Sequence, residues 1–254
     1  MATTRALAGL VVFGAALLVI DGPAGLSAAR LLRTLPLGLL GIAANQILFI
    51  EGLSRTTASH SAILVALLPV YVLILSALAG QERITTRKAA GVAIAFAGVV
   101  VVASEKGLSL SGGTLKGDLL TLCGGLAFAA YTVAGRPVLR DLGPMRTTAL
   151  SFMSGGAAIL VFGLPAALRV EWQSVSGTAL GGLAYIILVA TVVAYSLYYF
   201  AVDRLDPSKV AVFTYLQPLI AAAIAFAVRG EPVTVRLVAG GALILAGVVA
   251  AERG

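Results

Sequence analysis

The residues of this sequence that could contact a solute are amides and tyrosines placed inside long apolar runs. Asn45 and Gln46 lie near the middle of one run, and Gln217 directly precedes Pro218 in another. Amides at such positions are costly to bury unless they are paired, so we expect them to face protein or a water-filled cavity. Two roles stay open for them: hydrogen bonding between helices and contact with a substrate.

Tyrosines form a second group of candidates. Tyr195 and Tyr199 are four residues apart, so on a helix they share a face with Thr191. Such a face could line a cavity and hold aromatic or amphipathic solutes by stacking and hydroxyl contacts, with packing inside a bundle as the alternative. The predicted cavity residues are Asn45, Gln46, Tyr131, Thr191, Tyr195, Tyr199, Tyr215 and Gln217.

Two prolines lie inside apolar runs, Pro69 and Pro218. A proline within a helix removes a backbone donor and frees a carbonyl, which bends the helix. Each proline therefore predicts a kink that shapes the bundle or a hinge or gate beside the cavity.

The remaining chemistry-bearing residues favour structural roles. Glu82 and Glu231 each lie five residues before an arginine, Arg87 and Arg236, which indicates a helix cap or a local ion pair. The single histidine, His60, is expected at the surface rather than as a proton carrier. Cys123, the single cysteine, excludes an internal disulfide and is expected to pack inside.

The elements that must position these residues are membrane-spanning helices. With 59% apolar residues, 11% charged residues and a mean hydropathy of +1.02, the chain cannot fold in water without exposing large apolar patches. Solidly apolar runs favour helices over a barrel, whose strands alternate. We expect about nine spans: 6–20, 35–53, 61–79, 89–104, 116–133, 147–168, 178–200, 210–228 and 235–251. The first also resembles a secretory signal peptide, although a true span is favoured.

The composition excludes several classes of function. The net charge of +7 comes from lysines and arginines spread through short loops, so we expect no nucleic-acid partner. Nothing resembles a nucleotide-binding loop, a metal-ligand cluster or a nucleophile constellation. We therefore predict a protein that is not an enzyme and uses no cofactor or metal.

The chain repeats itself at an offset of 149 residues. Residues 55–100 align without a gap on residues 204–249, and 15 of the 46 paired positions are identical. The identical pairs include Pro69 with Pro218 and Glu82 with Glu231, which composition alone does not easily produce. The chain is predicted to hold two copies of one membrane unit: 1–104 and 116–254, joined by a loop at 105–115.

The charge distribution predicts that the two copies are inverted. With the connection at 21–34 inside, eleven lysines and arginines fall on the cytoplasmic side and seven on the other, which places the N-terminus outside and the C-terminus inside. Glu82 then lies inside and Glu231 outside. The span at 116–133 has no counterpart before Met1, so either the first unit lacks its opening helix or this chain begins downstream of a natural start.

Two segments resemble the halves of an EamA-type member of the drug/metabolite transporter superfamily. The first runs from Ala44 through Ser59 to Pro69 and Gln81-Glu82, and the second from Tyr198 through Ser208 to Gln217-Pro218 and Gly230 to Thr234. The resemblance implies ten helices in two inverted five-helix units, of which this chain lacks the first. It also implies transport of amino acids, nucleosides, other metabolites or drugs, usually outward.

These observations together predict a multi-pass protein of the cell membrane, in bacteria the cytoplasmic membrane. Inverted repeats can exchange two asymmetric conformations, one open to each side, and bind substrate near the midplane where the repeats meet. We expect a secondary transporter that exports a small metabolite or drug-like solute, an amino acid among the candidates. The alternative is a nontransporting assembly partner or receptor. The oligomeric state stays open.

Overall fold

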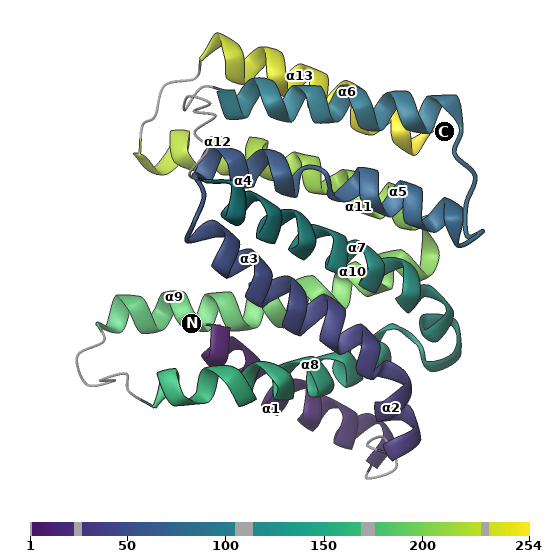
Figure 1. The fold of residues 1–254 in the computed structure, drawn as a ribbon, viewed down its shortest axis with the longest axis vertical. Coiled ribbons are helices and arrows are strands. Elements are labelled where there is room, and N and C mark those ends of the chain that lie inside the picture. The colour runs from purple at the N-terminus through teal and green to yellow at the C-terminus, as the bar shows by residue number, and fades with distance from the viewer. Residues whose placement is uncertain (1, 23–26, 105–113, 169–175, 230–233) are drawn as a thin grey trace. The chain divides into compact units, whose positions relative to one another are not determined.

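A computed structural model describes residues 2–22, 27–104, 114–168, 176–229 and 234–254, and every regular element among them is helical (Figure 1). The elements are α1 (Ala2–Asp21), α2 (Ala28–Leu37), the π-helix η2 (Gly38–Ala44), α3 (Asn45–Leu53), α4 (Ala58–Val65), α5 (Leu68–Leu78), α6 (Thr86–Ala103), α7 (Leu115–Leu142), α8 (Pro144–Ala167), α9 (Gly177–Ile187), the π-helix η6 (Leu188–Val193), α10 (Ala194–Arg204), α11 (Pro207–Val212), the 3₁₀-helix η7 (Phe213–Leu216), α12 (Gln217–Arg229) and α13 (Val235–Glu252).

Eight helical segments in the described part of the chain are long and apolar enough to cross a membrane. The remaining predicted span, 147–168, corresponds to the 24-residue helix α8 (Pro144–Ala167). The protein is thus an all-α polytopic membrane protein, as predicted. Helix α7 continues to Leu142, beyond the predicted end at Val133, because Arg136 and Arg140, which interrupt the apolar stretch, are themselves favourable in a helix.

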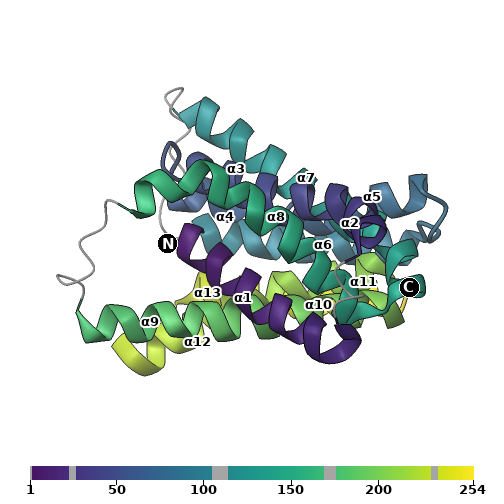
Figure 2. The ribbon, with the colours of Figure 1, turned by 90° about the horizontal axis from the view of Figure 1, so that it is seen from below.

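Local irregularities fall at matching places in the two halves of the chain. The π-helix η2 joins α2 to α3, so these three elements form one continuous helical segment. The π-helix η6 joins α9 to α10 in the same way, and this second segment can be followed in Figures 1 and 2. Helix α4 ends at Val65, four residues before Pro69, whose ring displaces the carbonyl of that residue. The equivalent stretch before Pro218 is the 3₁₀-helix η7. Both spans are therefore broken at the predicted prolines.

The helix bounds repeat with the same offset as the sequence. Helices α6 and α13 differ by 149 residues at both ends. Each begins after a threonine, Thr85 or Thr234, whose hydroxyl accepts a hydrogen bond from the backbone N–H three residues later, at 3.1 Å in both cases. The repeated residues therefore fold into repeated elements.

The chain forms two compact units, each of which takes segments from both halves of the sequence: unit 1 comprises 1–47 and 130–204, and unit 2 comprises 48–129 and 205–254. In unit 1, α1 packs along α8. Thr3 donates to the backbone oxygen of Gly163 at 3.3 Å, and Arg146 binds Asp21 near the other end of α1. The two helices are therefore antiparallel. Their contact buries Phe13 against Phe152, with ring centroids 4.7 Å apart.

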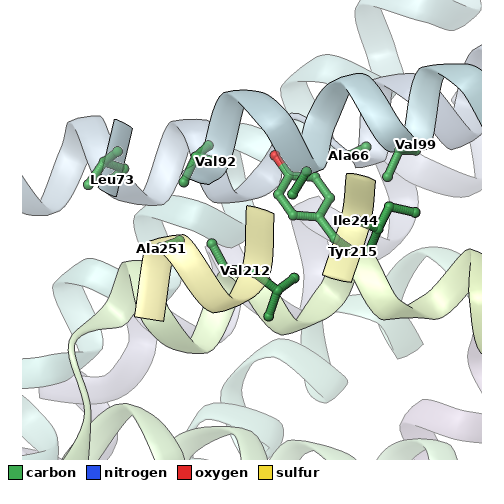
Figure 3. Packing of buried hydrophobic residues seen from close by; sticks show 10 residues of the cluster. Ala66, Leu73, Val92, Val99, Val212, Tyr215, Ile244 and Ala251 are labelled. Atoms are coloured by element: carbon green, nitrogen blue, oxygen red, sulfur yellow. The ribbon is translucent and has the colours of Figure 1, made fainter. Parts of the chain in front are cut away.

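In unit 2, α6 and α13 lie side by side (Figure 1). Gly91 faces Gly247 and Ala251, whereas Gly98 faces Gly240, so these two helices are also antiparallel. Without side chains at these four positions the backbones approach closely. The core around them holds Val92, Val99, Tyr215 and Ile244 (Figure 3).

Candidate functional site

Unit 2 contains a cavity of about 360 Å³, which is large enough for a small solute. It lies between the second half of α4 and the start of α12, beside Phe49 of α3 and Val99 of α6. The predicted residues Tyr215, Gln217 and Pro218 line it, together with Leu53, Ser61, Ala62, Val65, Ala66, Thr214 and Ala221. Pro218 therefore lies beside a cavity, as its proposed hinge role requires.

Two hydroxyl groups of this cavity lack hydrogen-bond partners among the described residues. They are Oη of Tyr215 and Oγ of Ser61, and both side chains are buried. By contrast, Thr214 donates its hydroxyl proton to the backbone oxygen of Ala211 at 2.7 Å. A buried polar atom without a partner is unfavourable, so the cavity presents two groups that a bound solute or water could satisfy. In Figure 3 the hydroxyl end of the Tyr215 ring points toward the side where Val92 and Ala66 are labelled.

The described residues that line the cavity are uncharged. Most are apolar, and the polar ones are hydroxyls and one amide. An ionic group would lose its hydration there without gaining an opposite charge. The cavity therefore suits an apolar or uncharged polar part of a solute.

Two of the tyrosines predicted to line a cavity, Tyr131 and Tyr199, lie in unit 1 and pack against each other. Tyr131 and Tyr199 are fully buried, stack with centroids 4.5 Å apart, and the Tyr199 hydroxyl donates to the backbone oxygen of Tyr131 at 3.1 Å. Gly41 leaves room for the Tyr131 ring and Gly135 for the Tyr199 hydroxyl, since a Cβ at either glycine would lie 2.2 Å from them. A solute could contact these two rings only after the helices around them move.

Thr191 lies on the π-helix η6 and Tyr195 on α10, so the α-helical spacing used to predict their shared face does not apply between them. Thr191 is buried on η6, and its hydroxyl accepts a hydrogen bond from Nε of Arg5 at 3.1 Å. Tyr195 is half-buried and meets Phe152 edge to face at 4.9 Å. Arg5 is a polar residue of this region that sequence reasoning passed over, because it precedes an apolar run like an ordinary flanking charge.

The amides at the centre of the α2 to α3 run are half-buried. Nε2 of Gln46 is buried and has no hydrogen-bond partner in the described part of the chain. Gln46 thus has an uncommitted donor, while Gln217 lines the cavity of unit 2. Whether either amide contacts a substrate stays a prediction.

Charged residues at one end of unit 2 form a buried network. Glu82 pairs with Lys88, Nζ to Oε2 2.7 Å, and not with Arg87, which is exposed. Glu82 also accepts hydrogen bonds from Ser76 and from Ser208, whose Oγ is 2.6 Å from Oε2. The expected ion pair of Glu82 therefore exists with a different partner, because Lys88 is the basic residue of this turn that faces inward. Glu231 lies outside the described residues.

Two expectations were wrong. His60 is buried, and its Nδ1 lies 3.3 Å from both carboxylate oxygens of Asp118, because α4 begins beside the first turn of α7. Cys123 is exposed, since an apolar helix surrounded by lipid has an outward face as apolar as its inward face. Ser61 and Phe49 were also missed as cavity residues, since a serine and a phenylalanine in apolar runs carry no distinguishing signal.

An all-helical polytopic membrane protein with broken spans around a solute-sized cavity has the architecture of a membrane transporter. The chain belongs to the EamA-like transporter family, whose family model matches residues 1–104 and 115–251.

Relatives agree with this assignment. The "Uncharacterized transporter YyaM" of Bacillus subtilis is 29% identical over 222 residues, which cover 85% of this chain and 71% of that protein. The "Probable terminal-alkyne amino-acid exporter" of Streptantibioticus cattleyicolor is 28% identical over 97% of this chain and 82% of its own length. A crystal structure that is 17% identical in sequence matches 99% of this chain and 86% of its own with a TM-score of 0.85, which shows the fold.

Proposed function

We propose that this transporter moves a small metabolite or drug-like solute across the cytoplasmic membrane of a bacterium by alternating access. The observation that carries the proposal lies within unit 2. Helix α11 packs against α5 at one end of the unit. At the other end the equivalent helices, α4 and α12, line the cavity. In an asymmetric state of two related halves, one helix pair is expected to be closed while the equivalent pair is separated by a cavity. The pair α5 and α11 is closed, and the pair α4 and α12 is separated.

The repeats 1–104 and 116–254, joined at 105–115, are proposed to be inverted in the membrane. Two pairs of equivalent helices support this orientation, because α1 is antiparallel to α8 and α6 is antiparallel to α13. Exchange of conformations between such repeats closes the open pair and opens the closed one. Pro69 and Pro218, where both spans are broken, are the proposed hinges.

The chemistry of the cavity supports a solute with an apolar body and an uncharged hydrogen-bonding group. Ser61, Tyr215 and Gln217 are the proposed polar contacts. We infer export as the direction of transport, and the relative named as an amino-acid exporter supports this direction.

Counterflow measured in proteoliposomes tests the proposal. The purified full chain is reconstituted, loaded with unlabelled solute and supplied with radiolabelled leucine, phenylalanine or adenosine. We expect saturable accumulation of at least one probe. Ala62→Trp should abolish it by filling the cavity, whereas Ala239→Trp, the same change at a residue of α13 that does not line the cavity, should not. Absence of counterflow across the panel, or normal counterflow in Ala62→Trp, would reject the proposal.

A further inference from the structure

We propose that the guanidinium group of Arg5 binds the carboxylate of a solute inside unit 1. The inference rests on the proposed transport function and adds a substrate class to it: monocarboxylates with an apolar body, including amino acids.

Arg5 lies within a candidate membrane span, residues 3–21. A long basic side chain near the end of a span usually extends toward the water. Here Nε of Arg5 donates to Thr191, which lies near the middle of the span 177–204 and is 1% exposed. The side chain therefore points into unit 1.

The hydrogen bond to Thr191 uses only part of the guanidinium group. Oγ1 of Thr191 donates its own proton to the backbone oxygen of Ile186 at 2.9 Å. It therefore accepts the hydrogen bond from Nε of Arg5 through a lone pair. This arrangement fixes the plane of the guanidinium group. The two terminal amino groups of Arg5 have no hydrogen-bond acceptor in the described part of the chain.

Charge pairing within unit 1 leaves Arg5 without a carboxylate among the described residues. Asp21 pairs with Arg30 and with Arg146, at 2.8 and 2.7 Å. The two other described carboxylates also pair with arginines, Asp141 with Arg33 and Asp203 with Arg204. An ionised side chain within a membrane span that lacks a counterion commonly marks a substrate or ion pathway.

A carboxylate is the group that fits this site. The terminal amino groups of arginine form a planar fork that matches the two oxygens of a carboxylate. Thr191 positions the fork, and Tyr195, four residues further along the chain on α10, offers an aromatic ring for the apolar body of the solute.

Equilibrium binding to the purified full chain tests the inference without relying on transport. Radiolabelled phenylalanine and benzoate are the probes, and phenylalaninamide and benzamide, in which an amide replaces the carboxylate, are the competitors. We expect the carboxylates to bind at least about tenfold more tightly than the amides. Arg5→Gln should remove this preference, Arg5→Lys should keep part of it, and Arg140→Gln, an equal charge change at an exposed position, should leave it intact.

Equal binding of carboxylates and amides to the unaltered protein would overturn the inference, as would a preference that survives in Arg5→Gln. A melting curve for each variant separates loss of the site from loss of the fold. Carboxylate preference without counterflow in proteoliposomes would reject the proposed transport and retain the site. Counterflow without carboxylate preference would reject the Arg5 site and retain the proposed transport.

Discussion

Nζ of Lys88 lies 3.0 Å from Oδ2 of Asp206, so a lysine of the first repeat binds a carboxylate of the second. Glu82 completes the network, and the side chains of Glu82 and Lys88 are only 2% and 5% exposed. The residues 149 positions away are Leu237 and Thr57, which cannot form this ion pair. The charged network therefore joins the repeats at one end of unit 2, the end where α5 and α11 are packed together.

Removal of Lys88 should destabilise the protein strongly. Lys88→Met leaves the Glu82 carboxylate buried without its counterion, and we expect a loss of about 3 kcal/mol in the free energy of unfolding. The double variant with Glu82→Gln should recover part of the loss, because the uncompensated charge is gone. Unfolding by denaturant in detergent measures both. Arg87→Met is the control, and an equal loss there would contradict the assignment of Lys88 as the partner.

Alanine at the close helix contact should separate α6 from α13. A Cβ on Gly91 would lie 2.3 Å from the backbone nitrogen of Ala251, and one on Gly247 would lie 2.3 Å from that of Ala95. Backbone atoms cannot move aside as a side chain can, so each alanine should cost about 1–3 kcal/mol of stability. Thermal unfolding in detergent provides the measurement. Gly181→Ala has no atom within 4 Å of its Cβ and should not destabilise, so a loss there as large as at Gly91 would refute the argument.

Removal of the Tyr215 hydroxyl and removal of the Tyr199 hydroxyl should change the stability of the protein in opposite directions. Tyr215→Phe deletes a buried hydroxyl that lacks a partner among the described residues, so stability should rise by about 1 kcal/mol while affinity for the transported solute falls. Tyr199→Phe deletes a hydroxyl bonded to the Tyr131 carbonyl and should lower stability by about 1 kcal/mol. Unfolding curves and counterflow saturation measure the two effects. Unchanged affinity in Tyr215→Phe would remove Tyr215 from the solute site.

The threonine caps of α6 and α13 provide a test of membrane orientation. With Cys123 replaced by alanine, we expect Thr234→Cys to react with a membrane-impermeant maleimide in intact cells and Thr85→Cys to react only after permeabilisation. The physical reason is that the two caps begin antiparallel helices. Labelling of both cysteines from the same side would exclude inverted repeats and the proposed transport cycle.

Most helices and the membrane class were predictable from local signals. The apolar runs located the spans, and the prolines located the two breaks. The candidate site was predicted only in part, with Tyr215, Gln217 and Pro218 found at the cavity. Tyr131 and Tyr199 look equally suitable in sequence, yet they are stacked in the interior of unit 1.

The sequence by itself determined that the chain is helical and lies in a membrane, because backbone groups in lipid must be satisfied within each helix and apolar length sets each span. The 149-residue offset found in the sequence also separates the bounds of α6 and α13, since similar residues fold into similar elements. Only the tertiary structure decided which polar groups meet. Lys88 binds Asp206 from a distant part of the chain, Ser61 reaches a cavity, and Arg5 contacts Thr191. These relationships depend on the packing of helices far apart in sequence, where side-chain direction and neighbouring shape decide the partner.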